Sequence, residues 1–179
     1  MSCAKENLNK RPFVVNIVGE RSNVGKTTLI EGLIKELVKR GYKVGTIKHD
    51  IHGFDIDKEG KDTYKHRVAG ASTVIISSKN RMAMIKEVNE EEKLENLIKL
   101  LNDKDFIIVE GYKKSNLKKI EVFRKGVSSR IITPNDKLIC VATDIPLNLN
   151  KIKEIKCNDY KMLIDLLENL KYNQIERSW

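Results

Sequence analysis

The sequence is poor in the residues that mark several common classes of protein. Its 179 residues include three prolines, three cysteines and one tryptophan. Cys3, Cys140 and Cys157 match neither a disulfide framework nor a CxxC zinc pattern, because they are odd in number and far apart, and we expect a reducing compartment. No segment approaches the ~18 consecutive apolar residues of a membrane span, and the polar N-terminus lacks the apolar stretch of a secretory signal. These absences predict a cytoplasmic protein without a membrane partner.

Positive charge is in excess, with a formal net charge of +9 and a pI near 9.4. Such an excess can attract nucleic acid, anionic membranes or phosphorylated ligands. The Lys and Arg residues are dispersed along the chain, however, which indicates a solvated surface. Aromatic residues, on which bases stack, make up only 6% of the chain, and no nucleic-acid recognition motif is present. A basic nucleic-acid-binding protein is therefore a secondary alternative.

Strand-like and helix-like hydrophobic patterns alternate along the chain. The run Phe13–Val18 is almost wholly apolar, as in a strand covered on both faces, and apolar residues recur at helical spacing over residues 26–40. Further strands are predicted over residues 43–48, 73–78, 81–88, 105–109, 119–124 and 137–142, and further helices over residues 61–70, 90–101 and 159–170. This alternation, with short connections, predicts an open α/β sheet.

The predicted fold is therefore α/β, with the three-layer architecture of P-loop NTPases. We expect a mostly parallel sheet with helices on both faces and a small hairpin extension that turns at Lys79 and Asn80. The sequence has no internal repeat and no low-complexity tract, which favours one domain. The predicted organisation is a tail over residues 1–11, a single nucleotide-binding domain over residues 12–172 and a tail over residues 173–179.

The strongest motif is a glycine-containing loop between the first strand and the first helix. Such a loop can curl its backbone amides around phosphate oxygens, and the helix N-terminus adds its positive dipole end. Gly25 would let the backbone approach closely, Lys26 would reach the β- and γ-phosphates, and Thr27 would offer its hydroxyl to Mg²⁺. The residues predicted to bind nucleotide here are Gly19, Arg21, Asn23, Val24, Gly25, Lys26, Thr27 and Thr28. Five residues, not the usual four, separate the two glycines, which leaves the loop geometry open.

A P-loop also needs an acidic residue at the end of a nearby strand to hold the metal's water shell. Glu110, which closes the run DFIIV, is the predicted metal residue together with Thr27. The alternative for Glu110 is a structural ion pair with a basic neighbour such as Lys113. Given the P-loop, we favour the metal role.

Other candidates follow the ends of predicted strands, where open α/β sheets bind their ligands. Lys48 and His49 come after the second strand, and Asp144 follows LICVAT, where a carboxylate could pair with a nucleobase. The guanine-reading N-K-x-D pattern is absent, so spacing alone does not choose GTP over ATP. Asp57 and Asp62 are weak catalytic candidates that could reach Mg²⁺ or a water. The two histidines at 49 and 52 favour a solvent-facing loop over a transition-metal site.

Five segments together resemble the MobB family of molybdopterin-guanine dinucleotide biosynthesis adaptors. These segments are GKTTL, TIKHDIHGFDIDKEGKDTYKHRVAGA, IIVEGYK, KIEVFR and VATDIPLNLN. The resemblance implies a GTP-binding homodimer with weak GTPase activity at most. It implies partnership with the molybdenum cofactor guanylyltransferase, which joins GMP to molybdopterin, and molybdopterin itself is a candidate ligand. The family's histidine-aspartate block falls on Lys48, His49, His52, Asp57 and Asp62, and Arg21 is a candidate to reach phosphate across a dimer interface.

Three functions from different classes remain open on these observations. No obvious general base or nucleophile accompanies the P-loop, which favours an adaptor that binds GTP over rapid chemistry. The first alternative is a P-loop small-molecule kinase or ligase. The second is the nucleic-acid-binding protein considered above.

Overall fold

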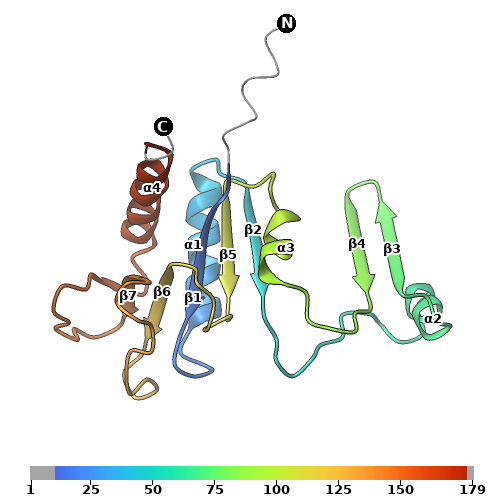
Figure 1. Cartoon of the computed structure of the whole chain (residues 1–179), viewed down its shortest axis with the longest axis horizontal. Coiled ribbons are helices and arrows are strands. Elements are labelled where there is room, and N and C mark those ends of the chain that lie inside the picture. Colours follow the sequence, from blue (N-terminus) through green and yellow to red (C-terminus); the bar gives the residue numbers. More distant parts are fainter. Residues whose placement is uncertain (1–10, 177–179) are drawn as a thin grey trace, which may run out of the picture. The chain divides into compact units, whose positions relative to one another are not determined.

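The computed structural model describes residues 11–176, and these residues form two compact units (Figure 1). The first unit contains the chain up to His49 and again from Ile98, and the second is Asp50–Leu97. The predicted N-terminal tail lies outside the described residues except for Arg11. The single-domain boundaries at residues 12 and 172 stay a prediction.

The first unit is built on a six-stranded sheet in the order β2-β5-β1-β6-β7-β8. Its strands are β1 (Phe13–Val18), β2 (Val44–Lys48), β5 (Phe106–Glu110), β6 (Lys119–Phe123), β7 (Leu138–Thr143) and β8 (Glu154–Lys156). Every pairing in this sheet is parallel, so the carboxyl ends of its strands meet at one edge. The α/β class and the mostly parallel sheet are confirmed.

Two long helices cover one face of this sheet and create the core. They are α1 (Lys26–Lys39) and α4 (Tyr160–Glu176). Their apolar stripes pack on alternate residues of the strands, because side chains along a strand point to opposite faces. The fully buried members of this core include Val15, Ile17, Leu33, Leu37, Phe106, Ile120, Cys140, Leu163, Ile164 and Leu167. On the other face, Leu101 and Lys104 lie over Gly45 of β2, where a Cβ would come within 2.9 Å of Leu101 Cδ1.

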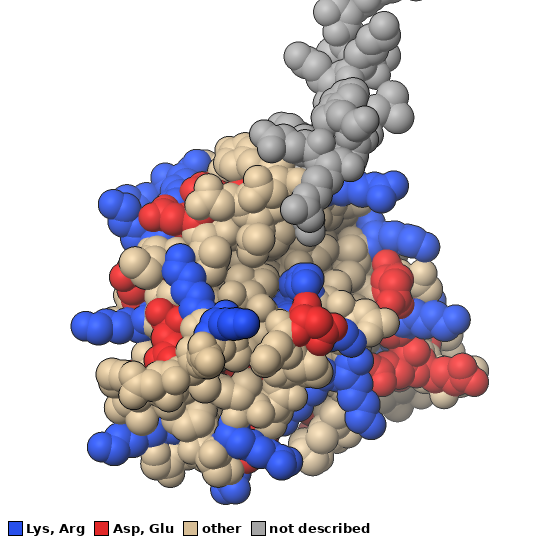
Figure 2. Space-filling model, turned by 60° about the vertical axis from the view of Figure 1, so that its left-hand side comes forward, with Lys and Arg blue, Asp and Glu red and all other residues tan. Residues whose placement is uncertain are grey.

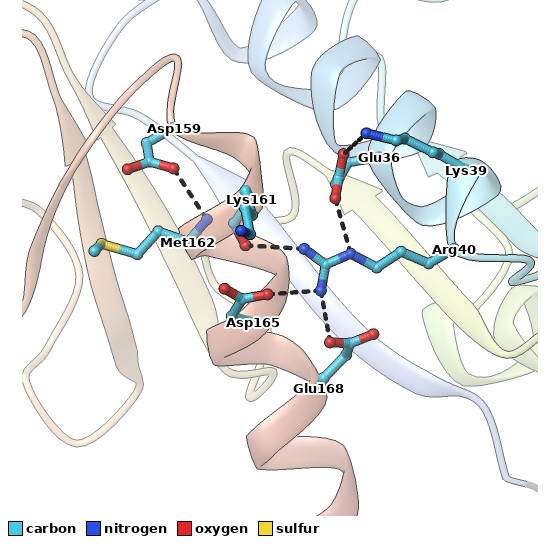
Figure 3. A network of polar contacts seen from close by, with 8 residues as sticks. All are labelled: Glu36, Lys39, Arg40, Asp159, Lys161, Met162, Asp165 and Glu168. Carbon is cyan, nitrogen blue, oxygen red and sulfur yellow. Dashed lines mark hydrogen bonds and ion pairs between the residues drawn. The ribbon is translucent and has the colours of Figure 1, made fainter.

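An arginine joins the two helices at the rim of the core (Figure 3). Arg40 follows the last residue of α1, and its Nε lies 2.8 Å from Glu36 Oε1 on the same helix. Its Nη1 lies 2.6 Å from Glu168 Oε2 and 2.7 Å from Asp165 Oδ1, both on α4. Nη2 donates to the carbonyl of Lys161 at 3.3 Å. One guanidinium thus holds α1 against α4.

The second unit contains a short helix and the predicted hairpin. Helix α2 covers Asp62–Val68, and β3 (Thr73–Ser78) pairs antiparallel with β4 (Arg81–Lys86). The two-residue turn at Lys79 and Asn80 is where the sequence predicted it. Helix α3 (Leu94–Lys99) contains the boundary between the units. The hairpin extension is therefore confirmed.

Three element predictions need correction. The helix predicted over residues 90–101 is reduced to α3, and the Glu92 carboxylate accepts hydrogen bonds from Lys93 N and Asn96 Nδ2 just where the helix begins, after its predicted start. Strand β8 was not predicted, since it has three residues and one apolar side chain, Ile155. Helix α4 covers Tyr160–Glu176 and so runs beyond residue 170, where the predicted helix ends.

A dispersed surface charge and the absence of a membrane span were also predicted from the sequence. Figure 2 shows Lys and Arg spread over the face drawn, with Asp and Glu between them, as expected of a solvated surface. Within residues 11–176, no helix has the length and apolar content that crossing a bilayer requires.

Candidate functional site

The glycine-containing loop joins β1 to α1 at the carboxyl edge of the sheet. Gly25 is the N-cap of α1 with φ 98°, and Asn23 also has a positive φ of 61°. Glycine adopts this left-handed conformation without the penalty that a Cβ imposes. Among the described side chains none caps the N-terminus of α1, so the amides of its first turn are available to an anion.

The position of Gly19 is explained by packing beneath the loop. A Cβ on Gly19 would lie 2.6 Å from Val24 Cγ2 and 3.2 Å from the carbonyl oxygen of Val122. Val24 is fully buried, and it anchors the loop to the core. With the usual four-residue spacing before Gly25, the first glycine would fall at position 20. That position is occupied by Glu20, whose carboxylate accepts hydrogen bonds from Ser129 N and Ser129 Oγ. The five-residue spacing is thus compatible with a formed phosphate loop.

Lys26 lies across this loop, with its Nζ donating to the carbonyl of Arg21 at 3.2 Å. Burial lowers the pKa of Lys26, the nearby Glu110 carboxylate opposes that shift, and the positive charges of Lys113 and Lys48 add to it. Glu110, Lys113 and Lys48 are therefore close enough to Lys26 to interact with it electrostatically. A partly desolvated ammonium group held by a single loop carbonyl is well suited to move onto a phosphate.

The end of β5 places Glu110 beside this ammonium group. Glu110 is in register with Ile17 of β1 and with Lys48 of β2, and its carbonyl accepts a hydrogen bond from His49 N at 3.0 Å. Within residues 11–176, no group of three or more His, Cys, Asp or Glu could hold a metal. Mg²⁺ suits such a site, since it is commonly bound through one or two protein oxygens, several waters and substrate phosphates. The Glu110 carboxylate and the exposed Thr27 hydroxyl fit this donor set.

His49, predicted to bind nucleotide, packs on the segment that follows Glu110. Its ring stacks on that of Tyr112, with centroids 4.4 Å apart and an interplanar angle of 22°. Gly111 has φ 88°, and a Cβ there would meet His49 Cβ at 3.1 Å. His49 therefore has a packing role at the edge of the site.

Two buried polar side chains, Asn16 and Lys119, donate hydrogen bonds to the segment of residues 111–118. Asn16 is fully buried, and its Nδ2 donates to the Tyr112 carbonyl and to Ser115 Oγ, at 3.2 Å each. Lys119 is 2% exposed, and its Nζ donates to the carbonyls of Ser115 at 2.6 Å and Leu117 at 2.9 Å. The segment in turn reaches the phosphate loop, because Lys113 Nζ donates to the Glu20 carbonyl at 2.9 Å.

Sequence reasoning missed three residues of this site, namely Glu20, Lys113 and Arg124. Arg124 Nε donates to the Val24 carbonyl at 3.2 Å, and its Nη2 lies 3.1 Å from where a Cβ on Gly25 would be. The signal for Arg124 was present, since KIEVFR was singled out as a motif and ends at this arginine. Lys113 was considered only as an alternative partner of Glu110.

Asp57 and Asp62 belong to the second unit and make their contacts there. Asp57 Oδ1 accepts from Thr63 Oγ1 at 2.9 Å, and its Oδ2 lies 3.5 Å from Arg67 Nε. The Asp62 side chain is 90% exposed and lies 3.7 Å from Lys65 Nζ. The weak catalytic role assigned to both aspartates stays a prediction.

The fold and this edge define a class: a P-loop protein of the α/β type, in which a parallel sheet presents a helix N-terminus and a lysine to an anion. Residues 14–144 match the family model described as "Molybdopterin guanine dinucleotide synthesis protein B". The chain belongs to this family, MobB, and the resemblance drawn from its motifs is confirmed.

Individual relatives cover most of the chain. It is 39% identical over 154 residues to the "Molybdopterin-guanine dinucleotide biosynthesis adapter protein" of Escherichia coli (strain K12), an alignment that covers 82% of this chain and 86% of the relative. The protein of the same name from Haemophilus influenzae is 33% identical, with 90% and 91% covered.

Solved structures agree with the fold. The crystal structure of a molybdopterin-guanine biosynthesis protein B superimposes with a TM-score of 0.69 at 27% identity, covering 89% of this chain and 99% of the other. A MobB homologue from Bacillus stearothermophilus gives a TM-score of 0.62 at 20% identity, covering 89% and 98%, and supports the fold alone.

Proposed function

We propose that this chain is a GTP-binding adaptor protein of molybdopterin-guanine dinucleotide biosynthesis, which assists the guanylyltransferase that attaches GMP to molybdopterin. The observation that carries the proposal is the uncapped N-terminus of α1 beside the partly buried Lys26. Backbone amides, a helix dipole and an ammonium group converge there, as a polyphosphate requires. The adapter names of the relatives support the pathway.

We propose further roles for Thr27, Glu110 and Asp144 around that centre. Thr27 and Glu110 would hold Mg²⁺ through the threonine hydroxyl and the glutamate carboxylate, and the ion would offset the negative charge of the phosphates. Asp144 would accept hydrogen bonds from the N–H groups on the Watson–Crick edge of guanine, which adenine cannot provide in the same pattern. We identify no general base among the described residues of this edge, and we therefore expect GTP hydrolysis to be slow at most.

The proposed adaptor is a homodimer, and the second unit supplies the support for this. Large hydrophobic side chains on both strands of the hairpin are exposed, namely Ile75, Ile76, Met82 and Met84. A lone two-stranded hairpin is marginally stable in water, so such side chains call for a covering surface. Sedimentation velocity separates monomer from dimer by their sedimentation coefficients, and a monomer at tens of micromolar protein would contradict the dimer.

Isothermal titration of GTP and ATP in the presence of Mg²⁺ tests the binding proposal. Lys26→Ala should weaken GTP binding by roughly 10- to 150-fold, the equivalent of losing a hydrogen bond to a charged group. The matched control is Lys35→Ala, which removes an exposed lysine from the same helix outside the site and should leave the affinity unchanged. Equal affinities in the Lys26→Ala variant and the unsubstituted protein would refute the phosphate site.

Turnover measurements separate the adaptor from a P-loop kinase or ligase. We expect GTP turnover far below ~1 s⁻¹, the lower range for ordinary enzymes, with or without small-molecule substrates. We also expect the chain to raise the yield of the guanylyltransferase reaction when both proteins are present. Rapid substrate-dependent nucleotide turnover by the chain alone would favour the enzyme.

A further inference from the structure

The segment that follows β6, residues 124–130, is attached to the phosphate loop at two points. At its start, Arg124 Nε donates to the Val24 carbonyl at 3.2 Å. At its end, Ser129 N and Ser129 Oγ each donate to the Glu20 carboxylate at 2.6 Å. These hydrogen bonds stabilise the ionised carboxylate and lower the pKa of Glu20 from its ordinary value of 4.5 to about 2. We call residues 124–130 the bridging segment.

The bridging segment is also attached to the candidate base-reading residue. The backbone N–H of Lys125 donates to Asp144 Oδ1 at 3.0 Å. Lys125 directly follows Arg124, so the backbone contact with Asp144 and the side-chain contact with the phosphate loop are made by adjacent residues. Two hydrogen bonds, joined by the side chain and backbone of Arg124, therefore connect Val24 to Asp144.

Contacts within and below the segment make this path stiff. Val127 N and Ser128 N donate to the carbonyl of Arg124 at 3.1 and 2.9 Å, and Ser128 Oγ accepts from Arg124 N at 3.1 Å, which closes a tight turn. Beyond the segment, the buried Glu121 carboxylate accepts from Ile132 N and Thr133 N at 2.9 and 2.8 Å. The segment is thus fixed at both ends, and it can set a distance.

We propose that Arg124 and Glu20 are positioning residues that set the distance between the phosphate loop and Asp144, and thereby the selectivity of the site for guanine over adenine. The inference rests on the proposed GTP binding and concerns how the same site chooses its base. The phosphate loop holds the triphosphate of GTP and ATP alike. Discrimination must then come from the base, and a hydrogen bond to the base weakens steeply when its donor and acceptor are misplaced.

The proposal predicts a separation of two effects that a loss of charge alone would not produce. Loosening the bridging segment should lower GTP affinity more than ATP affinity, because only GTP uses the correctly placed carboxylate. Inorganic tripolyphosphate, which has no base, should bind as before. Removing Lys26 should instead weaken all three ligands together.

Dissociation constants for GTP, ATP and tripolyphosphate test this in the full chain with Mg²⁺. In Arg124→Gln we expect the ratio of GTP to ATP affinity to fall by roughly tenfold or more, the effect of one misplaced charged hydrogen bond, with tripolyphosphate within about threefold of the unsubstituted protein. Arg124→Lys keeps the charge but not the guanidinium geometry, and should lose selectivity as well. Glu20→Gln should give a smaller loss in the same direction.

Charge-matched controls are Lys35→Gln and Glu31→Gln, both exposed positions on α1. They should keep the GTP to ATP ratio, and circular dichroism confirms that each variant is folded. An unchanged ratio in folded Arg124→Gln and Arg124→Lys would overturn the inference. Equal weakening of all three ligands would also overturn it, by making Arg124 a phosphate ligand. If the unsubstituted protein bound none of the three, the proposed function itself would fail, and this inference with it.

Discussion

In the first unit, α1 and α4 bury one face of a parallel sheet, whereas in the second unit Val74 and Leu94 are the only buried large hydrophobic residues among those described. Most of the exposed large hydrophobic side chains of the described chain belong to the second unit. They include Ile51, Phe54, Ile56, Val68, Ile75, Ile76, Met82, Met84 and Val88. The first unit can therefore be stabilised by its own core, whereas the second unit buries too few apolar side chains to be stabilised by a core of its own.

Each unit also has an arginine that gathers carboxylates, and the comparison of the two is informative. Arg40 joins helices that a core already packs together. Arg67 contacts Asp55, Asp57 and Glu87 in a unit with little apolar burial. Burial of apolar surface is the dominant stabilising contribution in folding. We therefore expect Arg40 to add stability to helices that the core already holds together, and Arg67 to be a main source of order in the second unit.

The largest expected effect is on the core of the first unit. Leu33→Ala removes a fully buried side chain of α1 and should lower the free energy of unfolding by about 2–5 kcal/mol, because the cavity cannot fully close. Chemical denaturation followed by circular dichroism measures this loss.

The paired change in the second unit is Ile76→Ala, at a side chain that is 56% exposed. At protein concentrations low enough to prevent association, it should change the free energy of unfolding by no more than about 0.5 kcal/mol. Similar losses of unfolding free energy in Leu33→Ala and Ile76→Ala would contradict the distinction between the two units.

The next effect compares the two arginines. Arg40→Gln should lower the free energy of global unfolding by about 1–2 kcal/mol, since it leaves carboxylates of both helices without their partner. Arg67→Gln should hardly change global unfolding, but should raise amide hydrogen exchange across residues 55–87. Hydrogen exchange read by mass spectrometry on both variants tests this. Increased exchange confined to α1 and α4 in Arg67→Gln would contradict it.

The course of the chain in the first unit could be predicted from sequence because its signals are local. Apolar runs identify β1 and β5, helical periodicity identifies α1, and the motif at Gly25 and Lys26 identifies the phosphate loop. Glu20 and Arg124 could not be predicted as partners of that loop, because they meet residues 129–130 and Val24, which are about a hundred positions away in the chain. Such contacts follow from the strand order and are not encoded by spacing.

The second unit shows the opposite limit of sequence reasoning. Its hairpin was predicted from alternation and a two-residue turn, yet nothing local separates apolar residues that form a core from apolar residues that stay exposed. Ile75 and Met84 are paired across the strands and are 60% and 49% exposed, although their types favour burial. Whether such residues become buried depends on a partner surface, and the alternating sequence pattern of the hairpin does not specify that partner.

A smaller effect on unfolding, with a clear effect on association, is expected at that pair. The double change Ile75→Ser and Met84→Ser removes two of the exposed apolar side chains on one face of the hairpin and should shift the proposed dimer toward monomer in sedimentation velocity. Hydrogen exchange in the first unit should remain as it was. The control is Ser77→Thr on the same face, which keeps the apolar pair and should keep the dimer.

The smallest effect is on the acid sensitivity of the second unit. The Asp57 N–H and the Arg67 guanidinium hold the pKa of Asp55 below its ordinary value of 3.8. A carboxyl group with a lowered folded-state pKa binds fewer protons folded than unfolded, so its contribution is complete above about pH 3.8 and is lost as the pH falls below that value. Hydrogen exchange between pH 2.5 and 5, corrected for intrinsic rates, should therefore show residues 55–87 opening first.

Asp55→Asn should remove this pH dependence, whereas Asp62→Asn, at a side chain that is 90% exposed, should retain it. If the first unit opened at higher pH than the second, its core would not be the more robust of the two, and the contrast between a self-stabilised and a partner-dependent unit would be wrong.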